Sequence, residues 1–315
     1  MMWSLAALVI GFCIDLLVGD PHGFPHPVVL IGKCISVLER GLRCICPKTP
    51  SGERAAGAIL WGAVVIVSTA VPALLLWLSG LVSPWLRLAL ESVMCWQILA
   101  VKSLRDESMK VYDALESGDL AASRHAVSMI VGRDTDRLDD AAVTRAAVET
   151  VAENTSDGVV APLLFLAIGG APLGFFYKAV NTMDSMLGYV EPPYKNIGLV
   201  PAKADDVVNY MPARLTALLM ILISHRRGLL RFVFRNGSKH ASPNAGYPEA
   251  AMAGILNCRF GGAHLYHGLL IRKPYIGENN RNLCRRDYAR AVRINEGVTF
   301  LTVCLIVMSY YLIYF

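Results

Sequence analysis

The sequence predicts an all-α, polytopic integral membrane protein, and two observations support this fold class. Of the 315 residues, 54% are hydrophobic and only 17% are charged, whereas soluble domains carry about 25% charged residues. The apolar residues also come in long runs: Ala55–Leu86 is 32 residues without Asp, Glu, Lys, Arg or His. We expect about four firm transmembrane helices, one or two broken or re-entrant apolar segments and a cytoplasm-facing helical layer, all within one membrane-embedded domain, residues 1–315.

Four apolar segments are predicted to cross the bilayer as helices, because a span needs about 20 apolar residues. The first, 2–19, is apolar except for Asp15. It lacks the basic start and small-residue cleavage pattern of a signal peptide, so we expect an uncleaved anchor. The other three spans are expected near 56–78, 84–101 and 298–315.

Two further apolar segments are interrupted by helix-breaking or charged residues. Residues 158–177 carry no charge but contain two prolines and four glycines, and residues 207–224 contain Pro212 and Arg214. Broken helices are tolerated at membrane depth where they line protein or an aqueous cavity. We expect these segments to be broken or re-entrant.

Basic residues are concentrated in the connecting regions. Residues 225–297 contain 13 Lys and Arg against 4 Asp and Glu, whereas residues 102–157 contain 7 against 12. Basic loops stay on the inner side of a membrane, which predicts a multi-pass protein of the cell (inner) membrane whose active site faces the cytoplasm. Within the basic region, four cations recur every fourth residue, Arg227, Arg231, Arg235 and Lys239. This pattern favours a helix on the anionic lipid bilayer over nucleic-acid binding.

Polar residues form three clusters beside the broken segments. Glu149 and Glu153 are four apart and share a helical face, and such carboxylates can bind a divalent cation. For each cluster, the alternative is a purely structural role, as a helix cap or an internal ion pair. The other two clusters combine acids, amides and cations: Lys178, Asn181 and Asp184, then Asp205, Asp206, Asn209 and Arg214. Together they suggest Mg²⁺ and phosphate chemistry.

Two stretches rich in proline and glycine look like rigid ligand-binding loops. Gly19–Pro27 would present Asp20, His22 and His26, and Ser242–Glu249 would present Ser242 and Asn244. A metal site at His22 and His26 is a weaker interpretation than packing or substrate contact. The sequence has no G-x-x-x-x-G-K-[ST] motif, which is the phosphate-binding P-loop, so any nucleotide would be bound through a different motif.

Seven motifs, in order from about residue 15 to 277, closely resemble those of the adenosylcobinamide-phosphate synthase family of cobalamin biosynthesis. These motifs are Gly19–Pro27, Val131–Thr135, Glu149–Thr155, Tyr177–Ser185, Asp205–Tyr210, Ser242–Asn244 and Lys273–Gly277. The resemblance implies an ATP-dependent membrane ligase that joins adenosylcobyric acid to (R)-1-amino-2-propanol O-phosphate or ethanolamine phosphate. It also implies Mg²⁺, ATP as co-substrate and other membrane-bound late cobalamin-assembly enzymes as partners.

The resemblance leads to a hypothesis for each site residue. The expected catalytic residues are Glu149, Glu153, Asp184 and Lys178. The expected Mg²⁺ ligands are Glu149, Glu153, Asp184, Asp205 and Asp206. Lys178, Arg133 and Arg214 would neutralise phosphates, and Asn154, Asn181 and Asn209 would orient phosphate or amide groups. The corrin would meet the two rigid loops, which carry Asp20, His22, His26, Ser242 and Asn244. Lys273 is a further expected substrate-binding residue.

One shared site would need the polar residues at both ends of 158–177 on the same side of the membrane, which again predicts a re-entrant or broken segment. Two other functions fit the same polar clusters. One is a Mg²⁺-dependent intramembrane transferase acting on a polyprenyl or lipid phosphate. The other is a small-molecule transporter, although the sequence lacks the inverted repeat that many transporters show.

Overall fold

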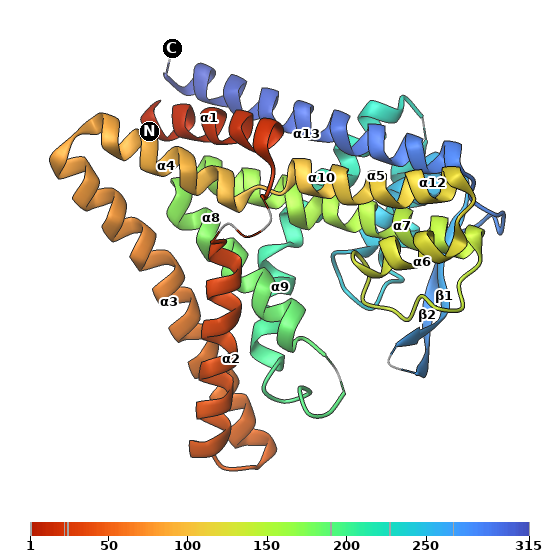
Figure 1. Ribbon diagram of the computed structural model, residues 1–315, viewed down its shortest axis with the longest axis horizontal. Helices are drawn as coiled ribbons and strands as arrows, with labels where there is room; N and C mark the ends of the chain where they lie inside the picture. The colour runs from red at the N-terminus through yellow and green to blue at the C-terminus, as the bar shows by residue number, and fades with distance from the viewer. Residues whose placement is uncertain are drawn as a thin grey trace. The chain divides into compact units, whose positions relative to one another are not determined.

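The computed structural model describes residues 2–21, 23, 25–189, 191–226, 228–266 and 268–314 (Figure 1). The chain divides into two compact units, each assembled from separate stretches of sequence. The first unit contains 1–100, 161–209 and 306–315, and the second contains 101–160 and 210–305. The fold is almost entirely helical, as predicted.

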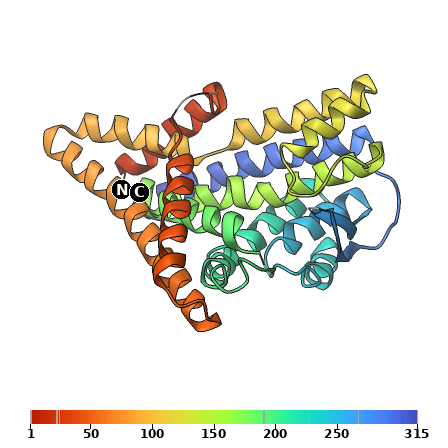
Figure 2. The same ribbon diagram turned by 60° about the horizontal axis from the view of Figure 1, so that its bottom comes forward.

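The first unit is a bundle of helices built around α3. Its helices are α1 (Met2–Val18), α2 (Pro27–Ile45), α3 (Pro50–Val82), α4 (Pro84–Ile98), α8 (Ala161–Leu187) and α9 (Leu199–Val208). Helix α3 packs against α2, α4, α8 and α9, and α1 packs against α4; Figure 2 shows α2 beside α3. Helices α3 and α4 each begin with a proline behind a hydroxyl cap, Thr49 and Ser83, which is a strong helix-start signal.

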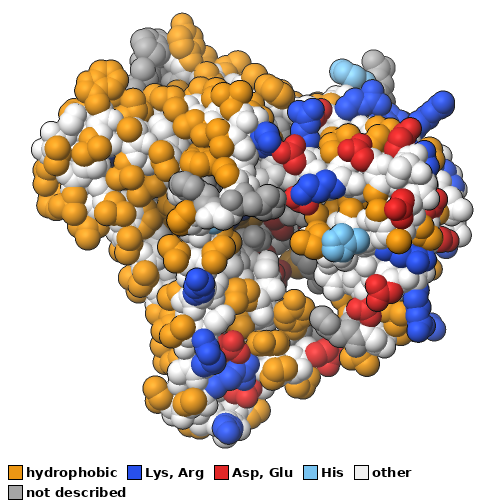
Figure 3. Space-filling model, in the orientation of Figure 1, with side chains coloured by type: hydrophobic (Ala, Val, Ile, Leu, Met, Phe, Trp, Pro, Cys, Tyr) orange, Lys and Arg blue, Asp and Glu red, His pale blue; other side chains and the backbone are white. Residues whose placement is uncertain are grey.

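Large apolar side chains cover the outer surface of α3 and α4. Ile66, Leu81 and Trp85 are each about two-thirds exposed or more, and Figure 3 shows this surface as almost continuously hydrophobic. Exposed apolar patches of this size mark a surface that meets lipid or another protein. This observation agrees with the predicted membrane location.

Three described helices are long and apolar enough to cross a membrane: Pro50–Val82, Asp140–Leu187 and Arg285–Ile313. A fourth candidate span is the bent pair of Leu199–Val208 and Tyr210–Ser224. The expected span 56–78 lies in the first of these helices, and the expected span 298–315 lies in the third as far as Ile313. The segment 158–177, which we expected to be broken or re-entrant, lies in the second. Those at 2–19 and 84–101 form the helices α1 and α4, of 17 and 15 residues, which are shorter than the roughly 20 residues of a typical span.

The predicted interruption of 158–177 is present as a break inside α8. Gly169 and Gly170 leave the helical conformation, and Gly170 has φ 64° and ψ −161°. A β-carbon at Gly170 would meet the carboxylate of Glu91, which is itself 2% exposed. The glycine is therefore required both by its backbone conformation and by the close approach of Glu91.

The second unit is a layer of shorter helices with one β-hairpin. Its elements are α5 (Val101–Ser117), α6 (Leu120–Ser128), α7 (Asp140–Asn154), the π-helix η1 (Thr155–Val160), α10 (Tyr210–Ser224), α11 (Leu229–Gly237), α12 (Gly246–Leu256), β1 (Arg259–Tyr266), β2 (Leu269–Gly277) and most of α13 (Arg285–Tyr314). Helix α12 is central, because it packs against α7, α10, α11 and both strands.

The β-hairpin was not anticipated from the sequence. Its strands pair antiparallel, with an irregularity between Phe260 and Gly262. Gly261 and Gly262 have φ values of 78° and 103°, which glycine adopts readily. These glycines bend the strand and turn its backbone toward α7.

Candidate functional site

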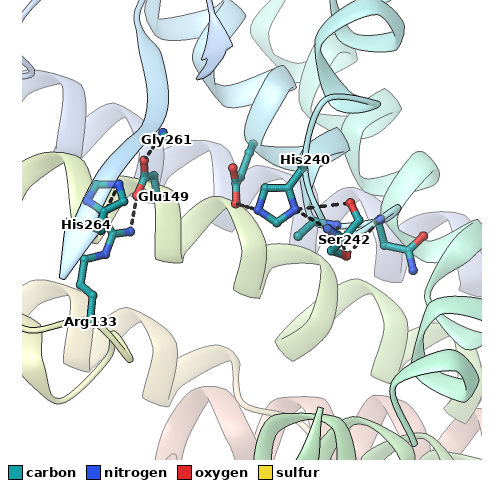
Figure 4. Close-up of polar contacts among 9 residues, drawn as sticks. Arg133, Glu149, His240, Ser242, Gly261 and His264 are labelled. Carbon is teal, nitrogen blue, oxygen red and sulfur yellow. Dashed lines mark hydrogen bonds and ion pairs between the residues drawn. The ribbon is translucent and has the colours of Figure 1, made fainter. Parts of the chain in front are cut away.

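A buried ion pair lies at the centre of the second unit. The guanidinium of Arg133, in the loop before α7, pairs with Oε2 of Glu149, and both side chains are more than nine-tenths buried. The backbone N–H of Gly261 donates to Oε1 of the same carboxylate at 2.9 Å. Glu149 therefore ties α7 to the loop before it and to the bulge of the hairpin (Figure 4).

His264 of β1 lies against the same guanidinium. Its two ring nitrogens are each 3.2 Å from Nη1 of Arg133. Burial lowers the pKa of His264, and the positive charge of Arg133 lowers it further. The imidazole is therefore favoured in its neutral form, in which one ring nitrogen can accept a hydrogen bond from Arg133.

A second pair, His240 and Glu249, links the loop after α11 to α12. The backbone N–H of Ser242 donates to Nδ1 of His240 at 2.9 Å, and Nε2 of His240 is 3.9 Å from Oε1 of Glu249. Burial raises the pKa of Glu249 well above its usual range, and the nearby carboxylates of Glu149 and Glu153 raise it further. The negative charges of Glu149 and Glu153 on α7 thus act on the carboxyl group of Glu249 on the neighbouring helix α12.

Lys273 of β2 supplies a cation to the same group of acids. Its Nζ is 5.3 Å from the centre of the Tyr266 ring. Burial alone would lower the pKa of Lys273, but the Tyr266 side chain and the carboxylates of Glu153 and Glu249 raise it. We call Arg133, Glu149, Glu153, His240, Glu249, His264 and Lys273 the acid–base cluster.

A cavity of about 500 Å³ adjoins the acid–base cluster inside the second unit. Arg133 and His264 line both features. The rest of the lining comes from the loop before α7 and from the hairpin, and includes Asp134, Asp136, Arg137 and Gly268. The cluster therefore borders a space large enough for a small ligand.

The other predicted residues of the second unit mostly stabilise backbone. Asn154 donates to the carbonyl of Thr150 at 3.0 Å. Oγ of Ser242 accepts the N–H groups of Asn244 and Ala245 at 3.2 and 3.3 Å. Arg214 donates to Oδ1 of Asn244 at 3.2 Å. Arg214 also lies over the rings of Tyr210 and Tyr247, so it braces the loop that precedes α12.

In the first unit, Asn209 belongs to a buried hydrogen-bond chain. The hydroxyl of Tyr177 donates to Oδ1 of Asn209 at 3.0 Å, and Nδ2 of Asn209 donates to both oxygens of Asp205 at 2.9 and 3.0 Å. Asp206 instead pairs with Lys203 at 3.0 Å. The two adjacent acids thus have different partners.

Lys178, Asn181 and Asp184 follow one another on α8 and are half-buried.

In the loop before α2, Nε2 of His26 lies 3.5 Å from Oδ1 of Asp20, and Nδ1 of His26 accepts the N–H of Val28 at 3.2 Å. His26 is therefore an N-cap of α2. The predicted residue His22 lies outside the described residues.

Among the described residues, three or more His, Cys, Asp or Glu side chains do not come together as a metal site. Glu149 and Glu153 share a helix but have different surroundings: Glu149 is 6% exposed, whereas Glu153 is exposed. The sequence-predicted Mg²⁺ ligands therefore remain a hypothesis.

Sequence reasoning assigned no role to three members of the acid–base cluster: His240, Glu249 and His264. His240 stands two residues before the predicted loop Ser242–Glu249, and Glu249 is the last residue of that loop, but only Ser242 and Asn244 were expected to contact a ligand. His264 has no local motif, because its role depends on pairing within the hairpin.

Comparison with known proteins identifies the family. Residues 8–295 match the family model described as CobD/Cbib protein. Cobalamin biosynthesis protein CobD of Geobacter metallireducens is 44% identical over 95% of both chains. CobD of Klebsiella pneumoniae is 42% identical, covering 98% of this chain and 99% of its own. Cobalamin biosynthesis protein CbiB of Salmonella typhimurium is 40% identical over 97% of both chains. No solved structure matches the chain. The chain belongs to the CobD/CbiB family.

Proposed function

We propose that this protein acts in cobalamin biosynthesis and forms an amide bond. The acyl group is the free propionate carboxyl of adenosylcobyric acid. The amine is (R)-1-amino-2-propanol O-phosphate or ethanolamine phosphate, and the product is adenosylcobinamide phosphate. Family membership supports the pathway, and the acid–base cluster is the observation that carries the reaction type.

A carboxylate is a poor acyl donor at neutral pH, so the propionate must first be activated. In the proposed route, a propionate oxygen attacks the γ-phosphorus of ATP, ADP leaves and an acyl phosphate forms. The amine, having lost one proton, attacks the acyl carbon. The C–O bond to phosphate breaks, inorganic phosphate departs, and the amide nitrogen loses its second proton.

The acid–base cluster offers groups suited to these steps. Lys273 and Arg133 are cations of the kind that stabilise phosphate charge. Arg133 is held in place by Glu149, which gives Glu149 a positioning role. Glu153 is exposed and lies near enough to Lys273 to raise its pKa. Lys178 and Asp184 of α8 remain in the proposal as catalytic residues on sequence grounds.

ATP reacts in enzymes as its Mg²⁺ complex, and carboxylates such as Glu153, Asp184, Asp205 and Asp206 are the ligands that Mg²⁺ prefers. The ion would neutralise phosphate charge when bound. Because the described acids do not converge as a metal site, no step above is assigned to the ion. We also propose that the site faces the cytoplasm, where ATP is available, beside other membrane-bound enzymes of late cobalamin assembly.

The test is an amidation assay with the purified protein in lipid nanodiscs. Adenosylcobyric acid and each amine phosphate are supplied with or without ATP, and the corrin product is identified by mass. We expect adenosylcobinamide phosphate only when ATP is present. A lipid-phosphate transferase or a transporter would give no amide in this assay.

Variants then test the site. Glu149→Ala and Asp184→Ala are expected to abolish product while leaving membrane insertion intact. Full activity of both purified variants would overturn the assignment of these residues. Glu278→Gln is the matched control, because Glu278 is exposed and pairs only with Arg235 among the described residues.

A further inference from the structure

Helix α11 has one side packed on α12 and one side that carries exposed apolar and cationic residues. On the packed side, Leu229 and Phe232 lie against Gly254 of α12, and Val233 is 2% exposed. The exposed residues of the other side are Leu230, Arg231, Phe234 and Arg235. We call these four residues the α11 face. Because α12 holds the opposite side of the helix, this face is formed before any partner binds.

The α11 face consists of two parallel rows. Leu230 and Phe234 are four residues apart, as are Arg231 and Arg235, so the members of each pair are neighbours along the helix surface. Leu230 and Phe234 are 49% and 54% exposed. Arg235 pairs with Glu278, and both of these side chains are 62% exposed. Arg231 has no ion pair or hydrogen bond within the part of the chain that the structure describes. An apolar row therefore lies exposed beside a cationic row.

The sequence around α11 is strongly basic. Residues 225–239 contain five Lys and Arg and no Asp or Glu. Two of the four cations predicted to recur every fourth residue, Arg231 and Arg235, lie on the α11 face. Lys239 is exposed just beyond the end of the helix, and Arg227 lies outside the described residues. Cations next to exposed apolar side chains are typical of helices that lie on an anionic lipid surface.

Helix α11 also follows a candidate membrane span closely. Helix α10 ends at Ser224 and is part of the bent pair that is long and apolar enough to cross a membrane. Only residues 225–228 separate it from α11, and the two helices are in contact. The apolar side chains exposed on α10 include Met211, Leu218 and Leu222. If α10 lies in the bilayer, so short a connection keeps α11 at the level of the lipid headgroups.

We propose that the α11 face lies on the surface of the bilayer and binds anionic phospholipid. Leu230 and Phe234 insert among the upper parts of the acyl chains, and Arg231 and Arg235 bind lipid phosphate groups. An anionic bilayer matches the apolar row and the cationic row together, and the neighbouring candidate span favours lipid over a protein partner. This inference goes beyond the proposed function and does not depend on it.

Photo-crosslinking of the full-length protein tests the proposal. The photoreactive amino acid benzoylphenylalanine replaces Phe234 or, in a second variant, Leu230. Each variant is placed in nanodiscs of phosphatidylcholine alone or of equal parts phosphatidylcholine and phosphatidylglycerol, and lipid adducts are quantified by mass spectrometry. We expect adducts at both positions, with a several-fold higher yield when phosphatidylglycerol is present. The same label at Met129, an exposed residue at the end of α6, is the positional control and should give few lipid adducts.

Removal of the two arginines tests the contribution of charge. Each cation near an anionic lipid surface favours binding by about fivefold. The double variant Arg231→Gln, Arg235→Gln should therefore lose most of the increase that phosphatidylglycerol gives at position 234. The double variant Lys110→Gln, Arg286→Gln removes two exposed cations elsewhere in the second unit and should keep the increase.

Three results would overturn the proposal. The first is an equal yield of lipid adducts in the two lipid compositions. The second is a phosphatidylglycerol dependence that survives the loss of Arg231 and Arg235. The third is crosslinking of positions 230 and 234 to another polypeptide in native membranes without lipid adducts, which would identify the α11 face as a protein interface. If the label at one position prevents folding, the other position still decides.

Discussion

Arg133 and Glu149 form an ion pair whose two side chains are both more than nine-tenths buried. Glu149 also accepts the N–H of Gly261, so the pair fixes the hairpin to α7. Replacing Arg133 with Met would leave Glu149 buried without its counter-ion. Removing one partner of a buried pair costs about 3–5 kcal/mol, and we expect Arg133→Met to lower the free energy of unfolding by that order in a denaturant titration.

The double variant Arg133→Met, Glu149→Gln removes both charges and keeps a group that accepts the Gly261 N–H. It should recover most of the lost stability, since replacing a whole buried pair is often nearly neutral. A double variant as unstable as Arg133→Met alone would contradict this account. Arg137→Met is a suitable control, because Arg137 lines the neighbouring cavity without pairing with Glu149 among the described residues.

Sequence spacing located Glu149 and Glu153 on one helix correctly but could not distinguish their roles. Glu149 is buried by Arg133 and by Gly261, which is 112 residues further along the chain, whereas Glu153 stays exposed. The spacing of two acids predicts only that they share one face of a helix. Their surroundings depend on tertiary contacts that have no local signal.

The helices themselves were largely predictable, because long apolar runs and Pro-based caps are local features. The run that predicted a span at 56–78 lies inside α3, and the Gly169–Gly170 interruption is a real break. The hairpin was not predictable, since β2 is exposed over much of its length and its sequence lacks the alternation that marks a half-buried strand.

Gly170 should not tolerate a side chain. Its φ and ψ of 64° and −161° lie in a region that is essentially restricted to glycine and costs other residues about 1–3 kcal/mol, and a β-carbon would also meet Glu91. We expect Gly170→Ala to reduce the yield of folded protein and its melting temperature in detergent. Gly62→Ala on α3 is the control, because its β-carbon would meet no atom; an equal loss there would refute the argument.

Asn209 should be required for stability of the first unit. It is 1% exposed and bridges Tyr177 and Asp205 through its amide oxygen and nitrogen. Asn209→Asp would replace the donor to Asp205 with a second carboxylate, so we expect a loss of about 1–3 kcal/mol per unsatisfied group. Thermal unfolding measures the loss. A variant as stable as the wild-type protein would show that this chain of hydrogen bonds is not needed for stability.

His264 should make stability depend on pH. Its pKa is lowered in the folded protein by burial and by Arg133, so below about pH 6.5 the unfolded chain binds a proton that the folded chain resists. Its contribution is therefore complete above about pH 6.5 and is lost as the pH falls through the lowered folded pKa. The lowered pKa of His240 also makes the protein less stable as the pH falls, whereas the raised pKa of Glu249 makes it less stable as the pH rises.

The measurement that isolates His264 is therefore the difference in stability between wild type and His264→Gln. We expect unfolding midpoints from about pH 5 to about pH 8 to show a smaller acid-side loss in His264→Gln than in wild type. His125→Gln, at an exposed site on α6, should follow the wild-type curve, and coincident curves for wild type and His264→Gln would rule out this role for His264.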